Sequence, residues 1–105
     1  MKKFTYTKGP WWMSTAGEIL KMPEQIKITN FVSGANRQEA ENNTRLVTAS
    51  PELYEELLDA YKRNEFLGKN NTYRWSDEKV EQVKKLLEKI TCLTVEELME
   101  EQYGI

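Results

Sequence analysis

The sequence contains no histidine and only one cysteine, Cys92, among its 105 residues. Histidine is the commonest general base at neutral pH and a common metal ligand. A single cysteine excludes zinc sites built from several Cys and His ligands, and Ser-His or Cys-His nucleophile pairs are excluded as well. Of the two aspartates, Asp59 falls within a predicted helix and Asp77 in the first turn of another, where an acid has a structural reason to be. We therefore expect a protein that is not an enzyme and has no metal or cofactor, although catalysis by carboxylates alone stays open.

Long hydrophobic runs are also missing. No stretch of about 18 apolar residues occurs, so no transmembrane helix is expected. The amino-terminal MKKFTYTKGP has lysines but no apolar segment behind them, so we expect no secretory signal. One cysteine cannot form an internal disulfide, and the reducing cytoplasm is the simplest location. The length and a hydrophobic content of 39% predict one domain, residues 1–105.

The charge is nearly balanced overall but unevenly distributed. Residues 1–49 hold seven lysines and arginines against four glutamates, whereas residues 50–105 hold eight against thirteen acids. The last segment, residues 93–105, contains Glu96, Glu97, Glu100 and Glu101 and no base. Such asymmetry indicates either a partner-binding surface or a solvated helix.

The order of predicted elements is typical of an α+β fold. Turn residues separate short apolar segments in the first third of the chain, which predicts a small antiparallel sheet in a β-rich part, residues 1–34. Helical spacing of apolar residues follows in residues 36–104. The expected strands are 4–6, 11–13, 17–22 and 25–32, and the expected helices are 37–49, 51–63, 77–90 and a short one after Thr94 that ends at Gly104.

Local signals predict where these helices begin. Asn36 is the expected N-cap of the first, and Ser50 is a hydroxyl cap before Pro51 in the second. Ser76 is the expected cap of the third helix, and Thr94 and Glu97 form a capping-box pattern for the last. Cys92, between two helices, is expected to be a small buried apolar residue.

Two stretches together resemble a family of small phage and prophage proteins. The first is KGPWW, residues 8–12, and the second is EAENNTRLVTASPELYEELLDAYK, residues 39–62. The family has PGPW near its amino terminus and EANARLIAAAPELLEAL across a helix–Pro–helix junction. The matching residues are Gly9, Pro10, Trp11, Glu41, Asn43, Arg45, Leu46, Ala49, Pro51, Glu52, Leu53, Glu56 and Leu57. The departures are Thr44, Thr48 and Ser50 in place of alanine and Tyr54 in place of leucine.

The neighbouring tryptophans need separate explanations, because successive strand residues point to opposite faces. The motif position, Trp11, is expected to face inward under helix 51–63, where Leu53, Leu57 and Tyr61 would also face the sheet. Trp12 is then expected to face outward, unless strand curvature or a late helix covers it.

The resemblance implies a phage accessory or counter-defence factor in the cytoplasm of the infected bacterium. One group of such proteins sequesters nucleotide second messengers of host immunity, such as cyclic nucleotides or cyclised ADP-ribose. A binding site of this kind needs an aromatic face for the base, a cation for phosphate and an amide or hydroxyl for the base edge. We expect it to form in a homo-oligomer, from the candidates Trp12, Arg37, Asn43, Arg45, Tyr73, Arg74 and Trp75.

Other interpretations stay open for the same residues. Trp75 could pack on Val80 at the start of a helix, and Arg45 could form an ion pair with Glu41. The alternative function is a protein inhibitor of a host defence enzyme or nuclease. Its acidic surface would be Glu96, Glu97, Glu100 and Glu101. We do not expect nucleic-acid binding, because the basic excess of residues 1–49 is small.

Overall fold

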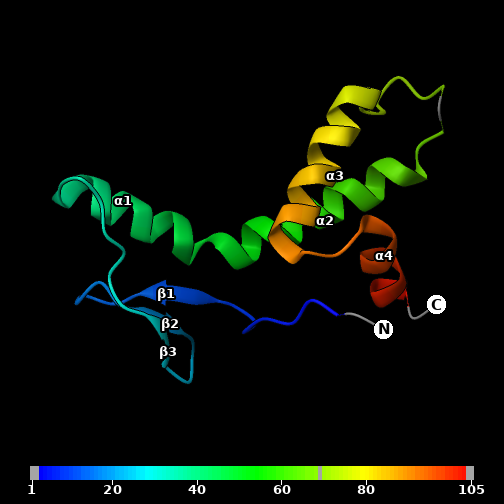
Figure 1. The fold of residues 1–105 in the computed structure, drawn as a ribbon. Helices are drawn as coiled ribbons and strands as arrows, with labels where there is room; N and C mark the ends of the chain where they lie inside the picture. Colours follow the sequence, from blue (N-terminus) through cyan, green and yellow to red (C-terminus); the bar gives the residue numbers. More distant parts are fainter. Residues whose placement is uncertain (1–2, 69, 104–105) are drawn as a thin grey trace. The chain divides into compact units, whose positions relative to one another are not determined.

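The computed structural model describes residues 3–68 and 70–103, with side chains up to Met99 (Figure 1). It confirms the α+β prediction, with three strands followed by four helices. The elements are β1 (Trp11–Met13), β2 (Ile19–Lys21), β3 (Ile26–Thr29), α1 (Arg37–Thr48), α2 (Ser50–Phe66), α3 (Asp77–Thr91) and α4 (Val95–Tyr103). Within the described chain, no helix is long and apolar enough to cross a bilayer.

The chain folds into two compact units, and each has its own buried residues. The sheet unit is residues 7–53, which include the three strands and α1. The helical unit contains the described residues up to Tyr6 and those from Tyr54 onward. The boundary falls inside α2, between Leu53 and Tyr54.

The sheet is an antiparallel meander in the order β1-β2-β3. Trp12 lies opposite Leu20, and Lys21 lies opposite Ile26, with an irregularity between Ile19 and Leu20. The predicted strand at residues 4–6 is wrong, because this segment has no strand pairing. Its side chains instead pack on the helical unit, as described below.

The sheet unit buries one face of the strands against α1. Ile19 is fully buried, and Ala40 of α1 is 6% exposed. Within β1, Trp11 is half-buried and Trp12 is 62% exposed, so the prediction that Trp12 faces outward is confirmed. The Trp11 indole N–H donates to the Thr7 carbonyl at 3.0 Å. β1 lies against α1, whereas the sequence predicted the helix at 51–63 as its neighbour.

The two halves of the phage-like motif meet within the sheet unit. A Cβ atom added at Gly9 would lie 3.5 Å from Pro51 Cβ and 3.3 Å from Glu52 Oε1. The Gly-Pro-Trp segment therefore runs directly over the start of α2. A Cβ at position 9 would fit only if the flexible Glu52 carboxylate moved by a few tenths of an ångström.

Thr44 joins α1 to the strand-to-helix connection and has no exposed surface. Its hydroxyl donates to the Ala40 carbonyl at 2.8 Å and accepts from the Val32 N–H at 3.1 Å. The alanine of the family pattern could not accept this hydrogen bond. The departure from the pattern at Thr44 therefore has a structural reason.

We expect Thr44→Val to destabilise the protein by about 1–3 kcal/mol, because the Val32 N–H would lose its acceptor in a partly buried position. Urea unfolding followed by circular dichroism measures this loss. Thr48→Val is the matched control, since the Thr48 hydroxyl only donates to the Thr44 carbonyl at 2.7 Å. An equal loss in both variants would contradict the role given to Thr44.

The junction between α1 and α2 is tighter than the sequence predicts. Ala49 is the C-cap of α1, and Ser50 is already the first residue of α2. The Ser50 hydroxyl donates to the Val47 carbonyl at 2.7 Å, and the Leu53 N–H reaches the Ala49 carbonyl at 3.0 Å. The prediction of Ser50 as a hydroxyl N-cap is therefore wrong, because this hydroxyl turns back toward α1.

The helical unit has the largest apolar cluster of the described chain. Its buried members are Leu58, Tyr61, Val83, Leu87, Leu93, Val95 and Leu98. The prediction that Leu53, Leu57 and Tyr61 face the sheet is wrong. Leu53 is 57% exposed, Tyr61 belongs to this cluster, and Leu57 packs against it. Burial raises the pKa of the Tyr61 phenol, and the Glu65 carboxylate adds to the shift, so the group stays neutral.

Contacts between three aromatic rings explain why the segment at residues 4–6 packs on α2 and does not form a strand. The Phe4 ring lies 5.2 Å from that of Tyr54, and the Tyr6 ring lies 5.6 Å from it, both in edge-on arrangements. The Tyr6 hydroxyl donates to Glu55 Oε1 at 2.7 Å. Tyr54 replaces the leucine of the family pattern, and its aromatic ring gives the amino-terminal segment a place to pack.

Three of the four predicted helix starts have the expected hydrogen bonds. Asn36 Oδ1 accepts from the Glu39 N–H, Ser76 Oγ from the Lys79 N–H, and Thr94 Oγ1 from the Glu97 N–H. Cys92, however, is exposed and has a left-handed backbone with φ of 58°, so its predicted burial is wrong. The predicted end of α4 at Gly104 lies outside the described residues.

Candidate functional site

A rigid turn between β1 and β2 forms one wall of the candidate site. The Gly17 N–H donates to the Ser14 carbonyl at 2.9 Å, and the Glu18 N–H donates to Ser14 Oγ at 3.1 Å. Gly17 has a φ of +83°, a conformation that a side chain disfavours. A Cβ at this position would lie 2.2 Å from the Phe31 ring, so the ring rests directly on Gly17.

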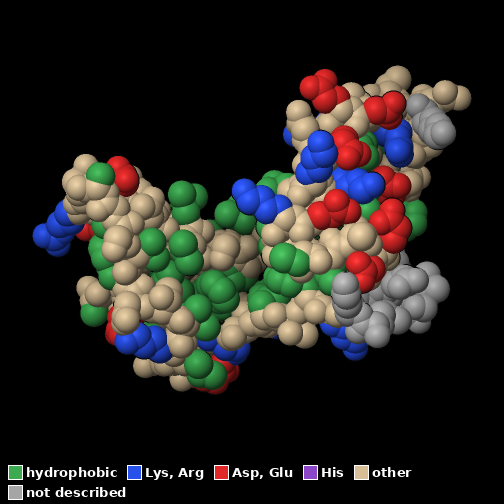
Figure 2. All heavy atoms as spheres, in the orientation of Figure 1, with side chains coloured by type: hydrophobic (Ala, Val, Ile, Leu, Met, Phe, Trp, Pro, Cys, Tyr) green, Lys and Arg blue, Asp and Glu red, His purple; other side chains and the backbone are tan. Residues whose placement is uncertain are grey.

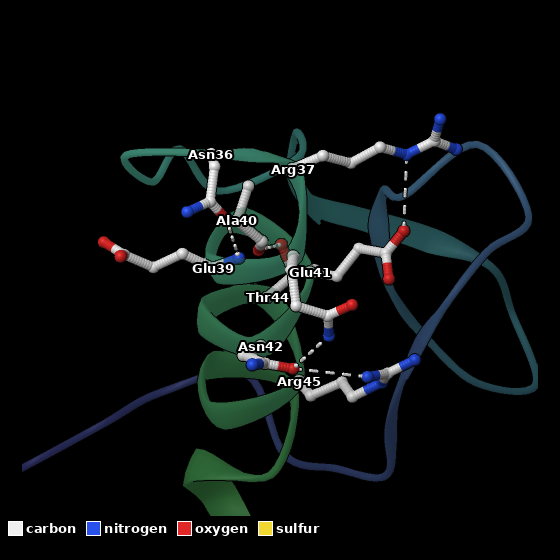
Figure 3. A network of polar contacts seen from close by, with 9 residues as sticks. Asn36, Arg37, Glu39, Ala40, Glu41, Asn42, Thr44 and Arg45 are labelled. Carbon is white, nitrogen blue, oxygen red and sulfur yellow. Dashed lines mark hydrogen bonds and ion pairs between the residues drawn. The ribbon is translucent and has the colours of Figure 1, made fainter.

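Helix α1 forms the opposite wall. Arg37, Glu41 and Arg45 follow at intervals of four residues and project from the same side of the helix (Figure 3). Arg37 Nε lies 3.6 Å from Glu41 Oε1, and Arg45 Nη1 lies 3.4 Å from Asn42 Oδ1. Glu41 therefore pairs with Arg37, and not with Arg45 as the alternative interpretation predicted. The Arg37 side chain is 92% exposed, so its guanidinium is accessible to a ligand.

Between these walls lies a hollow of about 390 Å³, which we call the arginine groove. This volume falls within the usual range for small-molecule sites. The lining residues are Met13, Ser14, Thr15, Ala16, Gly17, Phe31, Arg37, Glu41 and Arg45. The groove thus combines two cations, an exposed aromatic ring and turn hydroxyls. The cations can bind phosphate, the ring can stack on a flat base, and the hydroxyls can form hydrogen bonds with a sugar.

Two of the sequence-predicted residues in the sheet unit do not line the groove. The Asn43 side-chain amide donates to the Ser33 carbonyl at 2.9 Å and holds the connection before α1. Trp12 lies on the exposed part of the sheet, 62% accessible, and alternates with the groove residue Met13 along β1. Ligand binding by either residue stays a prediction.

The cluster at residues 73–75 belongs to the helical unit. Arg74 Nη1 donates to the carbonyls of Asn64 and Leu67 at 2.9 and 2.8 Å, so it satisfies the end of α2. The Trp75 ring packs against the apolar cluster, together with Val80. Tyr73 is 86% exposed. This arrangement supports the alternative interpretation of Trp75, in which it packs at the start of α3.

A second hollow, of about 270 Å³, lies beside this cluster and contains Tyr73 and Trp75. Its other lining residues are Glu56, Asp59, Ala60, Arg63, Asn64 and Leu67. We call it the Asn64 hollow. Arg37 and Arg45 thus line one hollow in the sheet unit, and Tyr73 and Trp75 line another in the helical unit.

The predicted acidic surface is only partly described. Glu96 is exposed, whereas Glu97 Oε1 accepts from the Thr94 N–H at 3.2 Å as part of the capping box. The side chains of Glu100 and Glu101 lie outside the described residues. Figure 2 shows lysines and arginines interspersed with acids over α3, so this part of the surface has no field of one sign.

Sequence reasoning missed four contributors to these sites. Phe31 and Gly17 fell in predicted strands, Glu41 was a motif match and a possible ion-pair partner, and Asn64 had no assigned role. The spacing of Glu41 between the arginines was the one signal available beforehand. Among the described residues, no group of three or more Cys, Asp and Glu side chains gathers as metal ligands would.

Comparison with known protein families gives a match to a phage protein family. The profile of a family described as Salmonella phage P22 protein Y8K6 matches residues 1–92. No curated protein matches the chain, and no solved structure does. The matched range includes both halves of the Gly-Pro-Trp and helix–Pro–helix motif, the arginine groove and the Asn64 hollow. On this match, the chain is a member of the Salmonella phage P22 Y8K6 protein family.

Proposed function

We propose that this phage protein binds an anionic nucleotide in the arginine groove and sequesters it without changing it. The observation that supports the proposal most directly is the placement of Arg37 and Arg45 around one hollow with Phe31 at its wall. Guanidinium groups form strong, directional hydrogen bonds with phosphate. A ring such as Phe31 offers a stacking face to any base.

The phage family and the geometry both support one class of ligand. Host defence systems signal with cyclic dinucleotides, cyclic trinucleotides and cyclised ADP-ribose, which combine bases with at least one phosphate. Arg37 and Arg45 lie two helical turns apart, about 12 Å along the axis. Such a separation suits a ligand with two phosphates better than a mononucleotide.

The first experiment is a thermal-shift screen of the purified chain against these cyclic nucleotides. A ligand at 100 times its Kd stabilises the folded state by about 2.7 kcal/mol, which is readily detected. Chromatography of the released ligand then separates sequestration from cleavage, and light scattering measures the oligomeric state. Unchanged ligand supports sequestration. If the protein is folded and none of these ligands raises its unfolding temperature, the proposal is overturned.

We expect Arg37→Ala and Arg45→Ala each to weaken nucleotide binding about tenfold, and the double variant about a hundredfold, at about 1.4 kcal/mol per tenfold. Both side chains are exposed, so the circular dichroism spectrum and unfolding midpoint should not change. Lys85→Ala, which removes an exposed cation outside the groove, is the charge-matched control. Equal weakening by the control would indicate general electrostatics instead of a site.

A further inference from the structure

The Asn64 hollow contains a buried polar group without a partner. Asn64 is 3% exposed, and its Oδ1 accepts from the Trp75 N–H at 2.8 Å. Its Nδ2 is buried and has no hydrogen-bond partner among the described residues. Such orphan donors are rare, because each costs about 1–3 kcal/mol. Asn64 lines the hollow, so a hydrogen-bond acceptor that enters there and displaces the groups covering Nδ2 would relieve this cost.

The amide is held in this orientation by the loop around it. Arg74 donates to the Asn64 and Leu67 carbonyls, and the Trp75 backbone holds Oδ1. The backbone carbonyl and Oδ1 of Asn64 therefore have fixed partners, and Nδ2 is the remaining donor of the side chain. Arg74 Nη1 uses both of its hydrogens on these two carbonyls, so this nitrogen is not available to a phosphate.

The charges around the hollow favour a cation. Glu56 and Asp59 lie one turn apart on α2, and both line the hollow. Asp59 is paired with Arg63 at 2.9 Å, whereas Glu56 has no ion pair among the described residues. The lining therefore has one more carboxylate than cations. An anionic nucleotide would find no unpaired cation among these lining side chains, in contrast to the arginine groove.

The aromatic side chains add a surface for such a cation. Trp75 already has Lys79 Nζ at 6.0 Å from its ring, which shows that a cation is compatible with this indole. Tyr73 is 86% exposed and borders the same hollow. A methylene stem can lie on these rings while the charged end reaches Glu56.

We propose that the Asn64 hollow binds a lysine or arginine side chain of a peptide segment. A backbone carbonyl of that segment accepts from Asn64 Nδ2, and the cationic end pairs with Glu56. The volume of about 270 Å³ is below the usual range for small-molecule ligands and suits one long side chain. A free polyamine fits less well, because it offers no acceptor to Asn64.

The test is an NMR titration of the ¹⁵N-labelled full chain with the blocked tripeptide acetyl-Ala-Lys-Ala-amide. The Asn64 side-chain amide and the Trp75 indole signals should shift, and added salt should weaken binding. The isosteric norleucine peptide should bind at least about tenfold more weakly, a difference of about 1.4 kcal/mol. Equal binding of both peptides, or no shift with either, would overturn the proposal.

Glu56→Gln should weaken lysine-peptide binding by about tenfold without changing the fold, since Glu56 is exposed. Glu65→Gln is the matched control, because Glu65 is an exposed acid of the same helix outside the hollow. Arg37→Ala should weaken nucleotide binding and leave peptide binding unchanged. The peptide proposal and the nucleotide proposal can therefore fail independently. A shift of the Asn64 signals by adenosine monophosphate and not by the lysine peptide would also overturn it.

Discussion

Leu87→Ala should destabilise the helical unit by about 2–5 kcal/mol, one of the largest losses available in this chain. Leu87 has no exposed surface and lies within the cluster that joins α2, α3 and α4. Removing its side chain loses the transfer free energy and leaves a cavity that neighbouring residues cannot fill. Urea unfolding followed by circular dichroism at 222 nm measures the change.

The adjacent residue supplies the control for this prediction. Leu86 is on the same helix and is 45% exposed, so Leu86→Ala should change the free energy of unfolding by less than about 1 kcal/mol. Both substitutions have the same effect on helix propensity. A similar loss in the two variants would show that the cluster is not the core of this unit.

Gly17→Ala should destabilise the sheet unit by about 2–5 kcal/mol. Part of this loss is backbone strain, because φ of +83° costs a residue with a Cβ roughly 1–2 kcal/mol. The rest is the overlap with Phe31, whose ring atom would lie 2.2 Å from the new Cβ. Since Gly17 and Phe31 both line the arginine groove, nucleotide binding should weaken in the same variant.

A double-mutant cycle separates the two causes. In a Phe31→Ala background the ring is absent, and Gly17→Ala should then cost only about 1–2 kcal/mol, the backbone part. Gly68→Ala is the control, because a Cβ there would meet nothing within 4 Å. If Gly17→Ala costs the same with and without Phe31, the contact between ring and turn does not contribute.

The outcome of the sequence predictions depends on how far apart the interacting groups are along the chain. Asn36, Ser76 and Thr94 were correctly predicted as caps, because a cap bonds to an N–H only three residues away. Ser50 had the same local chemistry, but the preceding helix continues up to it. Its hydroxyl therefore bonds to a carbonyl of α1.

The candidate sites were predictable to a smaller extent. The sequence spacing already placed Arg37 and Arg45 on one face of α1, and strand alternation placed Trp12 outward. Nothing local indicated that Phe31 would cover Gly17, or that Asn64 would hold the Trp75 backbone. Both contacts join residues more than ten positions apart, so they exist only once the elements have packed.

The sequence by itself determined three of the four helix starts, the order of strands and helices, the faces of α1 and β1, and the absence of histidine chemistry. The tertiary structure decided that α1 packs on the sheet, that most of α2 joins α3 and α4, and that two hollows of different charge result. The physical reason is that backbone hydrogen bonds and caps are satisfied within a few residues. Apolar burial is non-directional, and only the folded chain selects which faces meet.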